Sequence, residues 1–181
     1  MADLTGAARL TAFATAAALT AAQDLTRAAL PIVQPGADAE LVAEETLVLV
    51  ATLTSRAVET GLHEKPGVLA SVAPSLQELP LLYHDVLFGT EAIASGAEGE
   101  VAADPAVYER LARKAGFYAA HFAPGQFPGP RALADKLPLW MGRISPPKLP
   151  TTPEDRLGDT GAVDRLAAHT RLVLAFAQQA A

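Results

Sequence analysis

Apolar side chains recur at helical spacing from Asp38 to Gly61, and they fall on nearly every side of the helix that this spacing implies. Asp38 can accept hydrogen bonds from the first-turn N–H groups, and Gly61 is the residue type that commonly ends a helix in the left-handed conformation. A helix that is apolar almost all round is usually buried on most faces. The pattern therefore predicts that residues 38–61 form the central helix of an all-α domain.

Helical patterns also occur on both sides of this stretch. Pro74 and Pro80 are expected to divide the helical stretch after Gly61 into shorter helices. Proline is tolerated in the first turn of a helix but breaks its interior. Further helices are expected at residues 3–30, 68–72, 74–79, 81–94, 105–123 and 159–180. Together they predict one domain over residues 1–181, built as an irregular helical bundle of five or six helices.

Residues 124–158 differ in character from the rest of the chain. Eight of these 35 residues are proline, which excludes long regular structure, yet large apolar residues recur among them and argue against a free linker. We expect a proline-rich strap that lies over the bundle before the C-terminal helix. At most it holds short helical turns near residues 130–136 and 138–143.

Composition narrows the classes of protein. Half of the residues are apolar, which excludes general disorder, and the absence of cysteine excludes disulfides, thiol catalysis and cysteine-ligated metals. The uncharged run at residues 10–23 is shorter than the roughly 20 apolar residues that a membrane span needs. Asp3 offsets Arg9 ahead of this run, so we expect an uncleaved start, no membrane partner and a cytoplasmic protein.

The net charge of −6 conceals an asymmetry between two parts of the chain. Residues 1–104 hold 14 acids and 4 bases, whereas residues 105–181 hold 6 acids and 10 bases. The favoured interpretation is that the two parts attract each other within one globule, and the alternative is a basic face for an anionic partner. Ten bases in 77 residues lack the density of a nucleic-acid-binding tract, so no nucleic-acid partner is expected.

The chain carries neither a glycine-rich nucleotide motif nor a G-x-S-x-G nucleophile elbow. Three histidines, His84, His121 and His169, lie on three different expected helices. With Glu91 they could hold a divalent metal, because imidazole nitrogens and one carboxylate leave a coordination position open for water. No two of them share the i,i+3 or i,i+4 spacing, so no cofactor is expected. We interpret His169, on an apolar helix face, as a hydrogen-bonded core residue.

Polar residues also gather on one side of the expected central helix, at Glu44, Glu45, Thr52, Ser55, Arg56 and Glu59. If this strip were buried, it would form a site with paired carboxylates whose pKa values could separate. If it were exposed, it would be the solvated side of the helix. The solvated interpretation is favoured, since buried unpaired carboxylates are costly.

The strap offers the remaining candidate site, where Arg131, Lys136 and Arg143 interleave with Trp140 and Met141. Tryptophan, methionine and arginine are enriched at protein interfaces, and aromatic and basic residues together can also hold an anionic aromatic ligand. Trp140 could equally fix the strap to the core, and this role is favoured for that residue. Any interaction surface is expected on this segment.

These observations favour a non-catalytic helical protein that acts through protein–protein interaction or self-association, as a homodimer. Two alternatives remain. One is a metal-dependent helical-bundle enzyme that uses His84, His121 and His169, and the other is a small-ligand-binding helical domain with a pocket between helices.

Overall fold

The computed structural model describes residues 6–33, 36–94, 105–146 and 149–180, with side chains throughout these ranges except at 82–94. Within them the chain forms seven helices and no strand, so the all-α prediction is confirmed, with more helices than the five or six expected. The helices are α1 (Gly6–Val33), α2 (Ala39–Gly61), α3 (Pro66–Ala94), α4 (Pro105–His121), α5 (Pro130–Ile144), α6 (Pro153–Thr160) and α7 (Ala162–Gln179).

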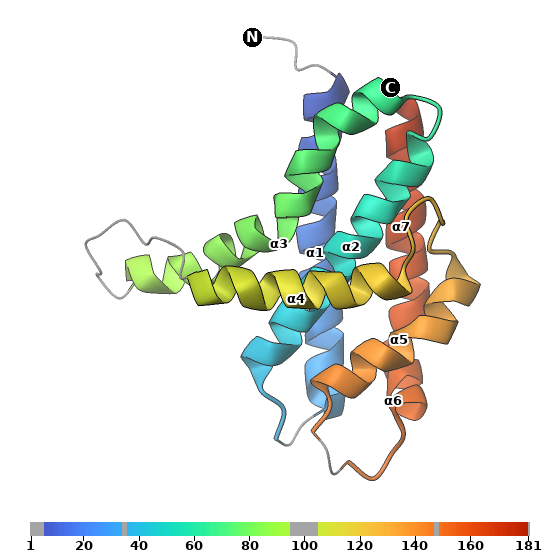
Figure 1. Ribbon diagram of the computed structural model, residues 1–181. Coiled ribbons are helices and arrows are strands. Elements are labelled where there is room, and N and C mark those ends of the chain that lie inside the picture. Colours follow the sequence, from blue (N-terminus) through green and yellow to red (C-terminus); the bar gives the residue numbers. More distant parts are fainter. Residues whose placement is uncertain (1–5, 34–35, 95–104, 147–148, 181) are drawn as a thin grey trace.

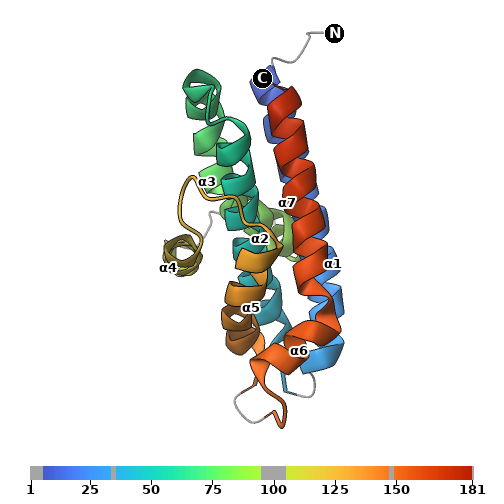
Figure 2. The same ribbon diagram turned by 90° about the vertical axis from the view of Figure 1, so that its right-hand side faces the viewer.

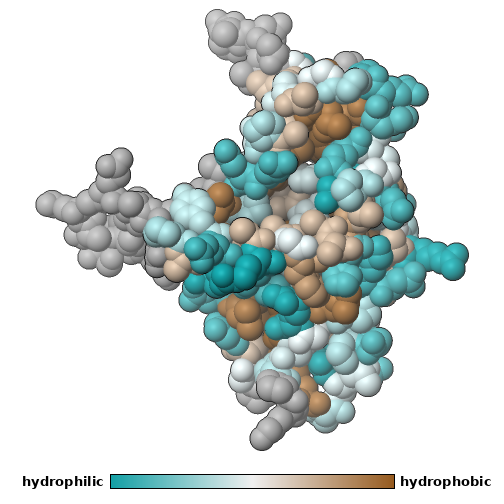
Figure 3. Space-filling view, viewed as in Figure 1, coloured by the Kyte–Doolittle hydropathy of each residue, from teal (hydrophilic) through white to brown (hydrophobic). Residues whose placement is uncertain are grey.

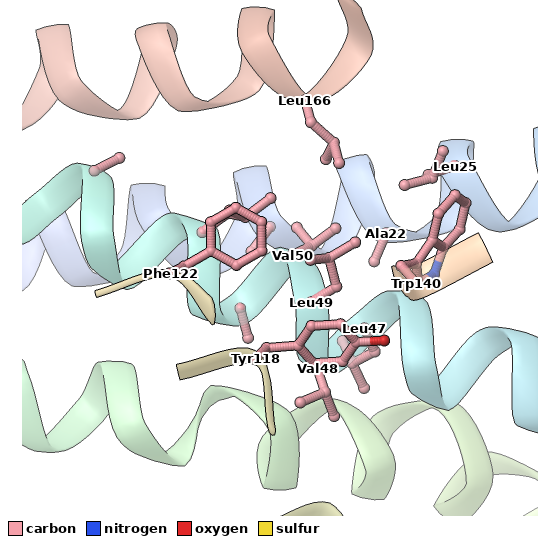
Figure 4. Close-up of a cluster of buried hydrophobic side chains, with 14 of the residues drawn as sticks. Ala22, Leu25, Leu47, Val48, Leu49, Val50, Tyr118, Phe122, Trp140 and Leu166 are labelled. Carbon is pink, nitrogen blue, oxygen red and sulfur yellow. The ribbon is translucent and has the colours of Figure 1, made fainter. Parts of the chain in front are cut away.

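Helix α2 lies at the centre, as its sequence predicts. It contacts α1, α3, α4, α5 and α7, and its residues 44–51 are all buried. Figures 1 and 2 show three layers: α1 and α7 side by side, then α2, and finally α4, which crosses the bundle on the outside. Figure 4 shows Leu47, Val48, Leu49 and Val50 of α2 among core side chains that come from several other helices.

Small residues let α1 approach its neighbours closely. Its buried residues are spaced three or four apart and are Leu10, Ala14, Ala18, Ala22, Leu25, Ala29 and Val33. Helix α7 runs antiparallel to α1, and the rings of Phe13 and Phe176 stack across the two helices at a centroid distance of 3.9 Å. The two helices therefore form a continuous layer against α2.

At the ends of α2, the expected cap at Asp38 is confirmed and the expected left-handed conformation of Gly61 is wrong. Asp38 Oδ1 accepts hydrogen bonds from the backbone N–H groups of Glu40, at 3.0 Å, and Leu41, at 3.3 Å. Gly61, however, is not in the left-handed conformation. A Cβ at this position would lie 2.7 Å from the Ala177 Cβ, so glycine is needed there for the close approach of α7.

Proline did not divide the helices as expected. Pro31, Pro74, Pro80 and Pro138 all lie inside helices, so the short helices expected around Pro74 and Pro80 are parts of the continuous α3. An interior proline costs about 3 kcal/mol, because it removes one hydrogen bond and crowds the preceding turn. Burial of neighbouring apolar residues, such as Leu79 in α3, offsets that cost.

The expected strap is largely helical. Residues 124–158 include α5 and most of α6, and Pro130 and Pro153 each occupy the first turn, where proline is tolerated. Thr152 and Asp155 form a capping box that starts α6, and Gly161, with φ +61°, joins α6 to α7. The last helix, α7, thus begins at Ala162 instead of near residue 159, because the residues before it belong to the separate helix α6.

Among the described helices, none combines the length and the apolar character that a bilayer crossing requires.

Candidate functional site

The strap residues expected at an interface are divided between core and surface. Trp140 and Met141 are fully buried, and the indole Nε1 of Trp140 donates a hydrogen bond to Thr46 Oγ1 at 3.2 Å. Figure 4 shows Trp140 next to Leu25 among the core side chains. In this structure Trp140 fixes α5 to α2, and neither residue lies on the surface.

The three basic residues of the strap have different surroundings. Lys136 donates a hydrogen bond to the carbonyl oxygen of His121 and lies 5.2 Å from the ring centroid of Phe122. Arg143 lies over the ring of Phe117, 4.5 Å from its centroid, and pairs with a buried carboxylate described below. Arg131 is exposed. Two of the three bases therefore hold the strap to the bundle.

The histidines proposed as metal ligands are placed in part. The side chains of His84 and Glu91 lie outside the described residues. His121 is half-buried at the end of α4, with its ring edge-on to Phe117 at a centroid distance of 4.7 Å. His169 is buried on α7 against α2. In the part of the chain whose side chains are described, no group of three histidine, aspartate or glutamate residues could hold a metal ion.

His169 is hydrogen-bonded in the core, as its sequence context predicts. Its Nε2 lies 2.8 Å from Thr54 Oγ1, and the Thr54 hydroxyl donates to the carbonyl oxygen of Val50 at 2.8 Å. The single hydroxyl proton is thus used on Val50, so His169 donates from Nε2–H and its Nδ1 is an acceptor. Burial lowers the pKa of His169 from 6.5 to about 4, so the ring is neutral at pH 7.

The strongest electrostatic feature is an ion cluster between α2, α4 and α5, in which the carboxylates, the lysine and the tyrosine are buried and the two arginines are partly exposed. Its members are Glu44, Glu45, Arg110, Lys114, Tyr118 and Arg143. Glu44 and Glu45, from the acidic part of the chain, pair with Arg110, Lys114 and Arg143 from the other part, which agrees with attraction within one globule. Hydrophilic side chains gather over α4 on the face seen in Figure 3.

Each carboxylate of the ion cluster has several charged or polar partners. Glu44 accepts from Arg110 at 2.6 Å and from Lys114 at 2.7 Å. Glu45 accepts from Tyr118 at 2.7 Å and from both Nη2 and Nε of Arg143, at 2.6 and 2.8 Å. The solvated interpretation of this part of the polar strip was therefore wrong, because bases from two other helices compensate the cost of burial.

The pKa values indicate what the ion cluster can do. Burial raises the pKa of Glu44 and Glu45, but the hydrogen bonds from Arg110 and Arg143 and the charge of Lys114 outweigh it, so both pKa values stay below 4.5. Burial and the neighbouring Glu45 raise the pKa of Tyr118. A general acid or base works best with a pKa near the operating pH. The pKa shifts of these three groups all run away from neutrality, and the contacts of the ion cluster join α4 and α5 to α2.

The rest of the polar strip lines a cavity of about 410 Å³ between α2, α3 and α4. Its polar lining includes Thr52, Ser55, Arg56, Glu59 and Gln77, and its wall on α4 consists of Ala112, Ala115, Gly116 and Ala119. Arg56 is held by its own helix and by α4: Nε donates to the Phe122 carbonyl oxygen at 2.7 Å, and Nη1 donates to Glu59 at 2.7 and 2.9 Å. The cavity is thus bordered by an arginine that is fixed in place and charge-paired with Glu59, and by small residues of α4.

An apolar groove of about 510 Å³ lies between α1 and α7. Phe13, Ala16, Ala17, Ala21, Leu166, Ala168 and Leu172 are its apolar lining, and Thr20, Asp24, Arg165 and His169 are its polar lining. The groove is hollow because alanines stand along α1 where larger residues would fill the space. His169 contributes to its lining, so a neutral imidazole borders the groove.

Leu172 is the feature that sequence reasoning missed. It is 56% exposed, against 41% for Leu139 and 38% for Tyr108 among the described large hydrophobic residues. The helical spacing of α7 could have shown that Leu172 points away from the face containing Leu166 and Val173. The groove beside it could not be found in this way, since its other wall is α1.

Comparison with known protein families, with curated proteins and with solved structures finds no match to this chain.

Proposed function

We propose that the protein acts without catalysis, by binding another protein chain, and that it docks through the α1–α7 face. This face comprises the groove and the exposed side chains from Arg9 to Asp24 on α1 and from Arg165 to Gln179 on α7. The observation that carries the proposal is the 56% exposed Leu172 beside an apolar groove. Contiguous exposed apolar surface on a globular protein commonly marks a binding surface.

The position of this face supports the same conclusion. Figure 2 shows α1 and α7 as the outer layer on one side of the bundle, with no described helix beyond them. Trp140 and Met141, the residues that suggested an interface on the strap, are in the core, so support for an interaction moves from α5 to the α1–α7 face. A cysteine-free chain suits a reducing compartment, and we propose a cytoplasmic location.

Site-specific photocrosslinking tests this function. The crosslinking amino acid p-benzoylphenylalanine is placed at Ala168, which is exposed and lines the groove, and in a second variant at Ala134, which is exposed on α5. We expect discrete protein adducts from position 168 in the protein's own cells, none from position 134, and loss of the adducts when Leu172→Glu is added. Equal adducts from both positions, or none from position 168, would contradict the proposal.

A second candidate function is the binding of a small neutral molecule in the α2–α3–α4 cavity. Its volume is in the range of ligand sites, and Arg56, which lines it, is held in place by the Phe122 carbonyl oxygen and by Glu59. Glu59 neutralises Arg56, so an uncharged ligand with acceptor and hydroxyl groups is favoured. Leucine at Gly116, where an added Cβ meets open space, would fill the cavity.

Native mass spectrometry tests this second candidate. We expect a small-molecule adduct on freshly purified protein, its loss in Gly116→Leu, and its retention in Gly67→Leu, a glycine whose surroundings are also open. Wild-type protein without an adduct, or an adduct that Gly116→Leu retains, would contradict it.

A further inference from the structure

Resting on the proposed function, we infer that the partner on the α1–α7 face is a second copy of this chain. The two copies are related by a two-fold axis that lies in the plane of the face. It crosses α1 at Ala16–Ala17 and α7 at Leu172. Such an interface is isologous, because each copy contributes the same surface.

The register of α1 against α7 shows where such an axis would cross both helices. Phe13 stacks on Phe176, and Asp24 and Arg165 line the same groove, so the antiparallel α1 and α7 stay in one register along the face. Arg9 and Gln179 line a second hollow at the opposite end. Ala16–Ala17 is midway between Arg9 and Asp24, and Leu172 is midway between Arg165 and Gln179. Both helices therefore have their midpoints at the same level.

Rotation about this axis brings complementary groups together. Arg9 of each copy lies opposite Asp24 of the other, and Arg165 of each lies opposite Gln179 of the other. Arg9 and Asp24 of one chain are fifteen residues apart along α1, or about 22 Å, so the two ion pairs form at separate ends of the face. Asp24 also lies 3.6 Å from Arg27 in an exposed pair, and exposed pairs of either kind contribute little, so the charged ends set the orientation of the two copies.

The centre of the face is apolar and self-complementary. Near the axis, the Leu172 side chains of the two copies meet each other beside the grooves, where Ala16, Ala17 and Ala21 leave room for them. Two helices about 10 Å across and about 22 Å long give a footprint of roughly 400 Å² per copy. This places the contact among weak interfaces, below about 1,200 Å² in total, so we expect dimerisation in the micromolar range.

Sedimentation equilibrium from about 1 to 500 µM tests the pairing. We expect a monomer–dimer equilibrium in wild type, at least about tenfold weaker in Leu172→Glu and unchanged in Leu139→Glu, a matched exposed leucine on α5. Arg9→Asp and Asp24→Arg should each weaken it, and the double reversal should restore it, because the cycle isolates their mutual interaction. All four substituted side chains are exposed, and thermal melts check that each variant folds.

The outcomes distinguish this inference from the function on which it rests. A wild type that is monomeric at about 500 µM, a dimer indifferent to Leu172→Glu, or a double reversal without rescue would overturn the two-fold pairing. If the chain is monomeric but crosslinking from position 168 captures a different protein, and Leu172→Glu abolishes that adduct, the docking function stands and the self-pairing falls. If position 168 captures nothing and no dimer forms, both fall.

Discussion

On acidification, protonation of His169 should destabilise the fold at a higher pH than protonation of Glu44 and Glu45. The ring is 7% exposed, donates to Thr54 and has its pKa lowered by burial to about 4, whereas the ordinary value is 6.5. Between these two pH values the unfolded chain binds a proton that the folded chain does not. Acidification therefore favours unfolding, and the stability that the neutral ring preserves at pH 7 is lost as the pH falls from about 6.5 to 4.

The magnitude follows from the difference between the two pKa values. Complete protonation below pH 4 corresponds to a loss of about 3 kcal/mol, and the change from pH 7.5 to pH 5.0 corresponds to about 2 kcal/mol. Glu44 and Glu45 contribute little in this window, because their pKa values lie below 4.5 and both stay ionised at pH 5.

Urea unfolding at pH 7.5 and 5.0 measures this loss, with His169→Gln as the control. Glutamine stays neutral, and its amide can still donate a hydrogen bond to Thr54. All other ionisable groups are the same in both proteins, so their contributions cancel in the comparison. We expect wild type to lose about 2 kcal/mol more than His169→Gln over this interval. A difference below about 0.5 kcal/mol would refute the assignment of His169 as a buried neutral histidine.

Three further predictions concern the core and the ion cluster, each read from urea unfolding. Leu53→Ala should cost about 2–5 kcal/mol because Leu53 is fully buried, whereas the exposed Leu139→Ala should cost less than about 0.5 kcal/mol, and equal losses would mean that α2 is not central. Glu45→Gln should cost about 1–3 kcal/mol, because it removes the buried carboxylate that Lys114, Tyr118 and Arg143 share, whereas the charge of the partly exposed Arg143 stays solvated. Because the pKa of Glu45 is lowered, the stabilisation that its carboxylate provides is present above pH 4.5 and is lost on further acidification. Glu45→Gln should lack this loss of stability. An acid profile that is the same in wild type and Glu45→Gln would contradict the prediction. Gly61→Ala should cost about 1–3 kcal/mol through its clash with α7, and a neutral effect would show that the two helices can separate without penalty.

Local patterns in the sequence determined the features that depend on one element. The all-round apolar stretch at residues 38–61 predicts a central helix, and Asp38 predicts its start, because burial and capping depend on spacing along one helix. The apolar face around His169 likewise predicts a core histidine, which the structure confirms. Proline positions were less informative, since burial of the flanking residues outweighs the local cost of Pro74 and Pro80.

Tertiary structure decided the features that need partners from distant parts of the chain. Glu44 and Glu45 form a polar strip in the sequence, and only the positions of Arg110 and Arg143 on α4 and α5 make their burial stable. The α1–α7 groove requires small residues of the first helix to lie opposite Leu172 of the last. Helical periodicity shows which face a side chain occupies, but which helices meet depends on the packing of the whole chain, and that packing creates both the ion cluster and the groove.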